Sequence, residues 1–307
     1  MNTAQIGGHP VSVTGRFSRI ARLRDEYYDF LEHPSEFLAI LNSHRGFSAN
    51  LFTFIQRVSD RTPRFQYRLE WDSAAVLQLS TYENWWKKQI NDKTRNMVRR
   101  AQKSGIEIRD AEFSDDLVRG IVRIYNETPV RQGRLFWHFG KSFATVKKEN
   151  ASFLDCSEFI GAYYKGELVG FIKLVHGEGV ANLMQIISMI SQRDKAPTNA
   201  LIAKAVERCA ARNVPFLHYG TWSRRSMGDF KRHHAFERME IPRYYVPLTV
   251  LGGMFLRCGL HRSLIDRMPE PWLDRLAVWR AKWNSFRYRD TRPSGAVAQL
   301  AERRSQE

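Results

Sequence analysis

The alternation of apolar and polar positions is clearest in residues 159–220. Two apolar runs, 159–175 and 179–191, are rich in aromatic and β-branched residues. Turn-like positions break them at 165–167 and 176–179. Runs of this length, composition and punctuation predict a three-stranded antiparallel meander.

A polar loop and a helix follow the meander. Pro197 is of a type favoured in the first turn of a helix, and Leu201, Ala205 and Cys209 recur at helical spacing. The chain then returns to a short apolar strand at 214–218. A strand, a helix and a neighbouring strand predict one parallel pair within an otherwise antiparallel sheet.

The same patterns divide the rest of the chain into elements, and residues 1–25 alone show no clear period. The helix at 82–104 has an apolar face of Trp86, Ile90, Met97 and Ala101, and its other faces are basic: Lys87, Lys88, Lys93, Arg95, Arg99, Arg100 and Lys103. Further helices are predicted at 34–41, 115–126, 141–154, 226–234 and, with interruptions, 251–288; strands are predicted at 51–57, 65–71, 74–79, 106–113 and 236–247.

Composition narrows the class of protein. The 307 residues include 48 Lys and Arg and 32 Asp and Glu, so the net charge is +16. This surplus favours anionic partners, namely CoA phosphates, RNA or an acidic membrane face, without choosing among them. The three cysteines are far apart, which fits a reducing compartment and indicates neither a metal site nor a disulfide framework. No signal peptide or spanning segment is recognisable, so we expect a cytoplasmic protein.

The loop before the second helix carries the first candidate chemistry. The first turn of a helix has unpaired N–H groups and the positive end of the helix dipole, so it binds phosphate. Arg193 and Lys195 add charge in the same loop. We therefore expect the backbone N–H groups from Ala196 to Asn199, Thr198 included, to bind a pyrophosphate together with the side chains of Arg193 and Lys195.

The order of elements over residues 105–249 resembles the GNAT acyltransferase superfamily. The loop from Arg193 to Thr198 occupies the place of that superfamily's pyrophosphate motif, Gln/Arg-x-x-Gly-x-Gly/Ala, although Ala196 and Thr198 stand where glycines are usual. The chain is also similar to the Fem-like branch, which transfers amino acids in peptidoglycan bridges. The basic helix that ends before Gly105, the Pro-x-Asn start at Pro197, and Phe230-Lys231 carry this likeness.

The resemblance implies an α+β fold: a GNAT-like mixed sheet, mostly antiparallel with one parallel splayed pair, flanked by helices. The expected parts are a small β-rich N-terminal part (1–81), a basic connecting helix (82–104), an acyltransferase domain (105–249), C-terminal amphipathic helices (250–292) and a tail (293–307) that is unlike the rest and is left out of the fold.

The resemblance also implies a GNAT-type N-acyltransferase that moves an acyl group, in the first instance acetyl, from acyl-CoA to an amine of a small polar acceptor. The backbone from Ser188 to Ile190 would hold the carbonyl, and Tyr219 would protonate the leaving thiolate. Glu127, His138 and Asp229 are candidates for the base. The loop with Arg131, Gln132, Trp137 and His138 would line the acceptor side.

Two other functions stay open at this point. Fem-like proteins take their acyl group from aminoacyl-tRNA, and the basic helix would suit that donor. Only one complete transferase domain is recognisable, however, so nucleic acid is the less favoured partner. The missing motif glycines also permit a non-catalytic binding protein. The C-terminal helices either pack on the domain or rest on an anionic membrane surface, and no oligomeric state is indicated.

Overall fold

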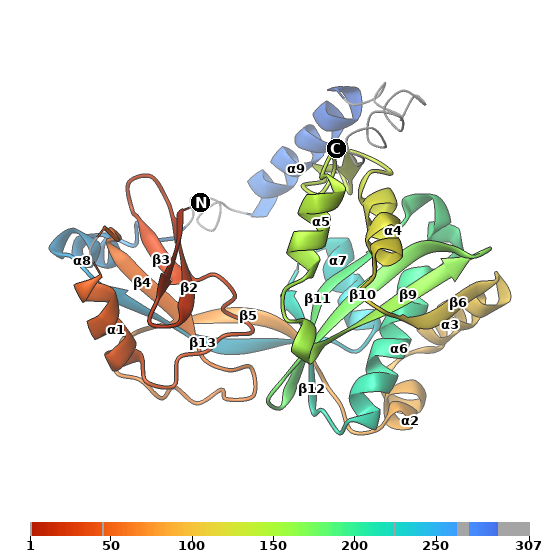
Figure 1. The fold of residues 1–307 in the computed structure, drawn as a ribbon, viewed down its shortest axis with the longest axis horizontal. Coiled ribbons are helices and arrows are strands. Elements are labelled where there is room, and N and C mark those ends of the chain that lie inside the picture. Colours follow the sequence, from red (N-terminus) through yellow and green to blue (C-terminus); the bar gives the residue numbers. More distant parts are fainter. Residues whose placement is uncertain (1, 45, 224, 263–269, 288–307) are drawn as a thin grey trace. The chain divides into compact units, whose positions relative to one another are not determined.

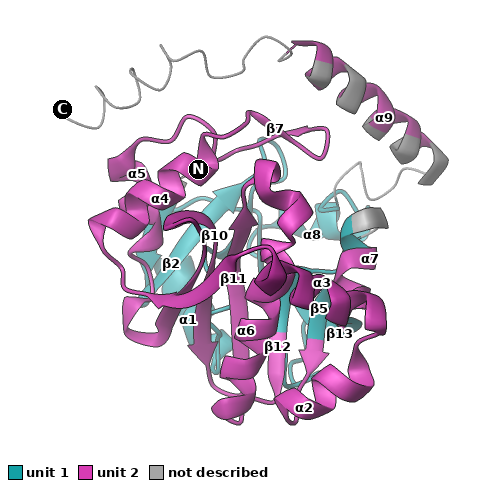
Figure 2. Cartoon of the chain, turned by 90° about the vertical axis from the view of Figure 1, so that its right-hand side faces the viewer, with its two compact units in different colours: residues 1–76, 218–228, 237–267 teal, residues 77–217, 229–236, 268–307 magenta. Residues whose placement is uncertain are grey.

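The computed structural model describes residues 2–44, 46–223, 225–262 and 270–287 (Figure 1). It confirms the α+β class, with a large and mostly antiparallel sheet, some parallel pairing, and flanking helices. The chain forms two compact units (Figure 2). Unit 1 is Met1–Val76, His218–Gly228 and Glu237–Arg267; unit 2 is Leu77–Leu217, Asp229–Phe236 and Met268–Glu307. The tail at 293–307 lies outside the described residues.

Unit 1 is a sheet with two helices. The strand order is β1 (Asn2–Ile6), β2 (His9–Thr14), β3 (Ile20–Leu23), β4 (Leu51–Ile55), β13 (Glu237–Pro247) and β5 (Arg68–Gln78), and the helices are α1 (Pro34–Ser43) and α8 (Val250–Arg257). β3 and β4 are parallel, and the pairs β1–β2, β2–β3, β4–β13 and β13–β5 are antiparallel. The two strands expected at 65–71 and 74–79 are one strand, β5.

The first 25 residues form strands, so the expectation of no regular element there was wrong. Gly7 and Gly8 both have positive φ and turn β1 into β2, where Ile6 pairs with His9. Ile6 and Leu23 are buried in the core of unit 1. These strands are four to six residues long and mix polar with apolar side chains, which hides their period in the sequence.

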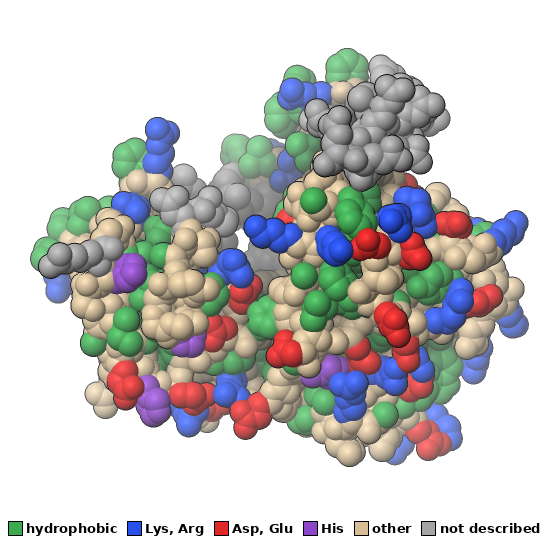
Figure 3. Space-filling model, in the orientation of Figure 1, with side chains coloured by type: hydrophobic (Ala, Val, Ile, Leu, Met, Phe, Trp, Pro, Cys, Tyr) green, Lys and Arg blue, Asp and Glu red, His purple; other side chains and the backbone are tan. Residues whose placement is uncertain are grey.

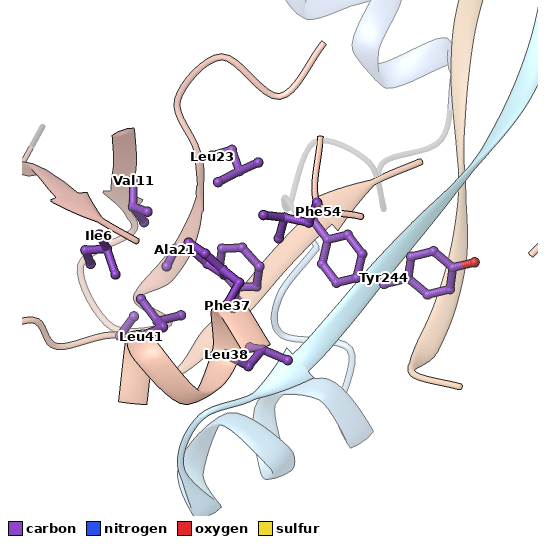
Figure 4. Close-up of a cluster of buried hydrophobic side chains, with 12 residues drawn as sticks. Ile6, Val11, Ala21, Leu23, Phe37, Leu38, Leu41, Phe54 and Tyr244 are labelled. Carbon is purple, nitrogen blue, oxygen red and sulfur yellow. The ribbon is translucent and has the colours of Figure 1, made fainter. Parts of the chain in front are cut away.

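The core of unit 1 explains why the chain returns to it after residue 236. β13 pairs antiparallel with both β4 and β5, with Tyr244 opposite Phe54. The rings of these two residues stack with centroids 5.2 Å apart, within a cluster that includes Phe37 (Figure 4). The strand that was expected to end the transferase sheet therefore completes the N-terminal unit. Arg243 on the same strand ion-pairs with Glu26 and Asp72, each at 2.8 Å.

Unit 2 contains the predicted meander. Its strand order is β12 (Phe216–Thr221, of which His218–Thr221 belong to unit 1), β11 (Val180–Ser188), β10 (Glu167–Gly177), β9 (Ser157–Tyr164) and β6 (Ile106–Ala111). β9, β10 and β11 pair antiparallel in sequence, as predicted. The helix α6 (Pro197–Ala211) connects β11 to its neighbour β12, which is the kind of connection that a parallel pair requires.

Helices bury the apolar faces of this sheet. α4 (Asp115–Tyr125) and α6 pack against β10, α5 (Phe143–Asn150) packs against α4, and α3 (Asp92–Lys103) packs against α6. One buried cluster joins Ile121 and Tyr125 of α4 to Phe171 of β10. Two 3-10 turns, η2 (Leu154–Cys156) and η3 (Ile190–Lys195), and two short strands, β7 (Val130–Arg131) and β8 (Arg134–Leu135), also belong to this unit. The remaining helices are α7 (Arg225–His233) and the 18-residue α9 (Glu270–Arg287).

The single long helix expected at 82–104 is interrupted. It consists of α2 (Tyr82–Asn84), a π-helical turn (Trp85–Gln89) and α3, with an extended residue at Ile90. Asn91 causes the break, because its side chain accepts a hydrogen bond from the N–H of Thr94 at 2.9 Å and so caps a new helix. The change in phase buries Trp85 and Val98, whereas the expected core residues Trp86 and Met97 are only half-buried.

Candidate functional site

The candidate site begins where β11 leaves the sheet of unit 2. After Ser188 the chain makes the turn η3 and then starts α6 at Pro197. Ala196 joins the two elements with a left-handed φ of 55°, a conformation that glycine adopts most easily. Alanine thus takes the backbone shape expected at this motif position, although the usual glycine is absent.

Glu127 holds the first residues of η3. Its carboxylate accepts hydrogen bonds from the backbone N–H of Ile190, at 2.7 Å, and of Ser191, at 2.8 Å. Glu127 follows α4 directly, so this contact ties the end of α4 to the exit of β11. Two N–H groups beside the expected pyrophosphate loop are therefore paired with a carboxylate.

Arg131 completes the same contact from β7. Its guanidinium donates to the carbonyl of Ser188 at 2.8 Å, to the carbonyl of Ile124 at 2.9 Å and to the carboxylate of Glu127 at 3.2 Å. The side chains of Glu127 and Arg131 are 17% and 15% exposed, so both charges are largely removed from water. Burial lowers the pKa of Arg131 from its ordinary value. We name this arrangement of Glu127 and Arg131 the β11 clamp.

The rest of the expected acceptor loop forms a hairpin and a ring stack. Gln132 occupies the turn between β7 and β8 with a φ of 51°. Trp137 is 71% exposed, and the Lys141 ammonium lies 3.6 Å from the centroid of its ring. His138 is buried against Tyr125, with ring centroids 4.0 Å apart, and burial lowers the pKa of His138 to about 4. His138 is therefore a neutral, packed imidazole at physiological pH.

The first turn of α6 is fixed by side chains on both sides. The hydroxyl of Thr198 lies 3.0 Å from that of Ser188. The Asn199 amide lies 3.2 Å from Nε2 of His234, whose Nδ1 lies 2.9 Å from the carbonyl of Phe230. Because a carbonyl can only accept, Nδ1 of His234 donates and Nε2 accepts from Asn199. Burial lowers the pKa of His234 to about 4, which keeps this ring neutral.

Comparisons with known proteins bear on this geometry. No family model matches the sequence, and no curated protein is detectably similar to it. Solved structures do match. FemX has 8% identity and a TM-score of 0.55, covering 81% of this chain and 86% of that chain. L-PGS from Bacillus licheniformis has 14% identity and a TM-score of 0.53, covering 81% of this chain and 84% of that chain.

A third match is the C-terminal domain (DUF2156) of a proposed lysylphosphatidylglycerol synthetase from Agrobacterium fabrum. It has 14% identity and a TM-score of 0.53, covering 83% of this chain and 86% of that chain. The chain has a Fem-like GNAT fold. Each coverage exceeds the share of the chain that unit 2 contains, so the likeness includes part of unit 1.

Within this Fem-like GNAT fold, the two basic side chains of the expected donor loop differ in their surroundings. Arg193 is exposed. Lys195 is half-buried, pairs with Asp194 at 3.6 Å and lies 4.9 Å from the centroid of the Tyr164 ring. Part of the charge of Lys195 is therefore already balanced, and Arg193 is the more available cation. Donor binding by either side chain stays a prediction.

The three expected catalytic residues are distributed over both units. Glu127 belongs to the β11 clamp. Asp229 lies on α7 in unit 2 and ion-pairs with Arg232, one turn further along that helix. Tyr219 lies on β12 and belongs to unit 1, and burial raises the pKa of its phenol. Their catalytic roles stay predictions.

Sequence reasoning missed two buried cationic side chains in unit 2. Lys173 lies in the middle of β10 and donates to the carbonyls of Asn150 and Ser152 beyond the end of α5, the first at 2.8 Å. Burial lowers the pKa of Lys173 to about 8. Lys231, part of the Phe-Lys segment, is also buried, and its pKa is likewise lowered to about 8. Its place inside an apolar strand is the one feature of the sequence that indicates a buried Lys173.

The structure also bears on metal binding and on membrane spanning. Over the described residues, no group of three or more His, Cys, Asp and Glu side chains is placed to hold a metal ion. In the same part of the chain, no helix is both long and apolar enough to cross a membrane.

Proposed function

We propose that the protein is an acyltransferase that takes an aminoacyl group from aminoacyl-tRNA and transfers it to an amine of a polar acceptor. The observation that carries this proposal is the β11 clamp. Glu127 occupies the N–H groups of Ile190 and Ser191, at 2.7 and 2.8 Å, beside the loop where acyl-CoA would place its pyrophosphate. A carboxylate repels a pyrophosphate at short range, and this repulsion is strong where water is partly excluded.

An aminoacyl ester removes that conflict. Its reacting carbonyl is joined to a ribose hydroxyl, so no pyrophosphate has to enter the loop. The acceptor nitrogen forms a new bond to the carbonyl carbon, the ester C–O bond breaks, and the ribose oxygen receives a proton as it leaves. The proton lost by the acceptor amine goes to a base, for which we propose Asp229 because it is 51% exposed and both oxygens of Glu127 are already hydrogen-bonded.

The charge of unit 2 also supports a nucleic-acid donor. Lys93, Arg99, Arg100 and Lys103 of α3 are exposed, and the Arg99 guanidinium lies 5.7 Å from the centroid of the Trp86 ring. Exposed cations along one helix suit the phosphates of a folded RNA. Arg95 differs from these residues, because it pairs with Asp92 and donates to the carbonyls of Trp86 and Ile90.

The extent of the likeness to FemX supports tRNA as a donor against the sequence argument. That argument rested on a single recognisable transferase domain. The likeness to FemX covers 81% of this chain and 86% of that chain, which is more than unit 2 supplies. The similarity to FemX and L-PGS supports aminoacyl transfer only through the shared fold.

Acyl-CoA is the second candidate donor, because α6 begins without a side-chain cap. The side chain of Ala196 provides no acceptor, although its carbonyl accepts from the N–H of Asn199 at 3.1 Å, and Arg193 is exposed nearby. An uncapped helix start next to an exposed arginine would suit a phosphate group. For either donor, we propose that Trp137 and Gln132 contact the acceptor, whereas Arg131 acts by positioning the end of β11.

Binding measurements separate the two donors. The protein is titrated with aminoacylated tRNA and, separately, with acetyl-CoA. The variant Arg99→Glu/Arg100→Glu/Lys103→Glu should lose tRNA affinity by at least about tenfold and show a shallower salt dependence. A matched variant with the same change in charge, Arg119→Glu/Lys147→Glu/Lys148→Glu on α4 and α5, should retain it. Tight acetyl-CoA binding, with no difference between the variants for tRNA, would favour the second donor.

A further inference from the structure

The helix α9 carries a continuous stripe of exposed apolar side chains. Trp272, Leu276, Trp279, Trp283 and Phe286 are between 49% and 75% exposed. They are spaced by four, three, four and three residues, so on a helix they fall within about a quarter of the circumference. The rings of Trp279 and Trp283 stack with centroids 5.9 Å apart. Five large apolar side chains on one exposed face need a partner.

Arginine lines both edges of this stripe. By helical position, Arg275 lies at one edge, and Arg280 and Arg287 lie at the other. All three are exposed. Among the α9 side chains that the structure describes, none is acidic. Figure 3 shows hydrophobic and basic side chains together on this helix, at the top of the view. The surface that covers the stripe must therefore tolerate or attract positive charge at its margins.

The helix is attached to unit 2 through a different face. Asn284 is buried and donates to the carbonyl of Gly133 at 3.0 Å, where α9 meets the β7–β8 hairpin. Asn284 lies about a third of a turn around the helix from the centre of the stripe. The rest of unit 2 contacts α9 at this side, and the stripe stays exposed.

A second copy of the chain is a poor partner for this face. The spacing of the stripe would suit a coiled coil, but flanking positions in coiled coils pair opposite charges across the seam. Here both flanks carry arginine, so two such helices would bring arginine against arginine. Tryptophan beside apolar residues, with arginine at the margins, is instead the composition of helices that lie in a membrane interface.

We propose that α9 docks this protein on the surface of an anionic lipid bilayer, with the helix axis in the plane of the membrane. Trp272, Trp279 and Trp283 enter the boundary between headgroups and acyl chains, and the three arginines contact anionic headgroups. The β7–β8 hairpin lies against α9 and exposes Leu135, and Trp137, two residues further along the chain, is exposed too, so docking also brings the expected acceptor loop to the membrane surface. The proposal does not depend on which donor the enzyme uses.

Sedimentation of the full chain with vesicles tests this proposal. Binding should be strong to vesicles of phosphatidylcholine with added phosphatidylglycerol, weak to phosphatidylcholine alone, and reduced by salt. Trp279→Ser/Trp283→Ser should reduce binding to the anionic vesicles by at least about tenfold. Arg275→Glu/Arg280→Glu/Arg287→Glu should reduce it by roughly a hundredfold. Because these side chains are exposed, the thermal midpoint of each variant should match that of the wild type.

A matched variant distinguishes a docking face from general charge. Arg99→Glu/Arg100→Glu/Lys103→Glu on α3 changes the net charge by the same amount and should retain most vesicle binding. Equal loss in both triple variants would overturn the proposal, as would equal binding to neutral and anionic vesicles or no binding at all. A dimer in sedimentation velocity that Trp279→Ser/Trp283→Ser dissociates would assign the stripe to a second copy instead.

Discussion

The carboxylate of Glu127 lies 2.7 Å from the backbone nitrogen of Ile190, a residue 63 positions further along the chain. The same carboxylate accepts from Ser191 and pairs with Arg131. One side chain thus joins the end of α4, the exit of β11 and the start of η3. This contact fixes the entrance to the expected donor loop and places a carboxylate there, paired with Arg131.

Removing the charge of Glu127 should change donor preference. Glu127→Gln keeps the shape of the side chain but loses the ion pair with Arg131 and one of the two N–H contacts. We expect the free energy of unfolding to fall by about 1–3 kcal/mol. We also expect the affinity for CoA to rise by about tenfold or more, because the repelling carboxylate is gone. Calorimetric titration with CoA and thermal unfolding measure the two effects.

Glu149→Gln provides the control for this change. Glu149 also lies in unit 2 and accepts from Lys141, at 2.7 and 2.8 Å, so its loss alters the net charge equally. CoA affinity should be the same in this variant as in the wild type. If Glu127→Gln left CoA affinity unchanged or weakened it, the clamp would not be what discriminates between donors.

Gly170 allows the close approach that sets the start of α6. A Cβ atom there would lie 2.5 Å from the hydroxyl oxygen of Ser188, which in turn contacts Thr198. We expect Gly170→Ala to displace Ser188, to destabilise the protein by about 1–3 kcal/mol and to lower turnover. Gly253→Ala is the control, because the nearest atom to its Cβ would be 4.0 Å away in Pro247. That variant should be neutral or more stable by up to about 1 kcal/mol. Equal effects of both would refute the packing argument.

Lys173 should make stability depend on alkaline pH. Burial lowers its pKa from 10.5 to about 8 in the folded protein. Between these two pH values the unfolded chain binds a proton that the folded protein does not bind, so the free energy of unfolding should rise with pH. Denaturant titrations at several pH values should show a smaller rise in Lys173→Met than in the wild type. Lys231, with a pKa also lowered to about 8, would supply the part that remains.

The exposed residue Lys148 is the matched control for this experiment. Lys148→Met should leave the alkaline profile as it is in the wild type. Buried phenols and the Cys209 thiol, whose pKa values are raised, lower the free energy of unfolding at alkaline pH in the wild type and the variant alike. A wild-type profile that matches that of Lys173→Met between pH 8 and pH 10.5 would therefore contradict the account of Lys173 as a buried cation held by the carbonyls of Asn150 and Ser152.

His138 should contribute to acid sensitivity. Its pKa is lowered from 6.5 to about 4 by burial, with Lys141 and Arg131 acting in the same direction. In this window the unfolded chain binds the additional proton, so the free energy of unfolding should fall as the pH is lowered from about 6.5 to about 4. His138→Phe preserves the ring packing on Tyr125 and should lose less stability over this range. An unchanged acid profile would show that His138 is not the group responsible.

The sequence predicted unit 2 well because its strands and helices carry strong local signals. The turns at 165–167 and 176–179 separate β9, β10 and β11, and Pro197 marks the start of α6. By contrast, β13 pairs with β4 and β5, which lie 161 to 196 positions earlier in the chain, and no local pattern contains that partner. The short strands in residues 1–25 were missed for a related reason, because pairing and two glycine turns define them.

The sequence singles out residues of the candidate site but does not predict their contacts. Glu127, Arg131 and Asn199 were all singled out from the sequence, and the structure shows what each one contacts. The pairing of Glu127 with Ile190 and of Asn199 with His234 depends on which loops the fold brings together. Amino-acid type reveals that a side chain can accept a hydrogen bond, but not whether a donor from a distant segment lies beside it.

Consumption of the donor tests the central claim most directly. The protein is incubated with a pool of tRNA carrying labelled amino acids and, in parallel, with acetyl-CoA, each against heat-denatured protein. If aminoacyl-tRNA is the donor, label should leave the tRNA faster than in the control, through transfer or slow hydrolysis, while acetyl-CoA stays intact. Loss of the thioester with no loss of label from any aminoacyl-tRNA would contradict the account and assign the donor as acyl-CoA.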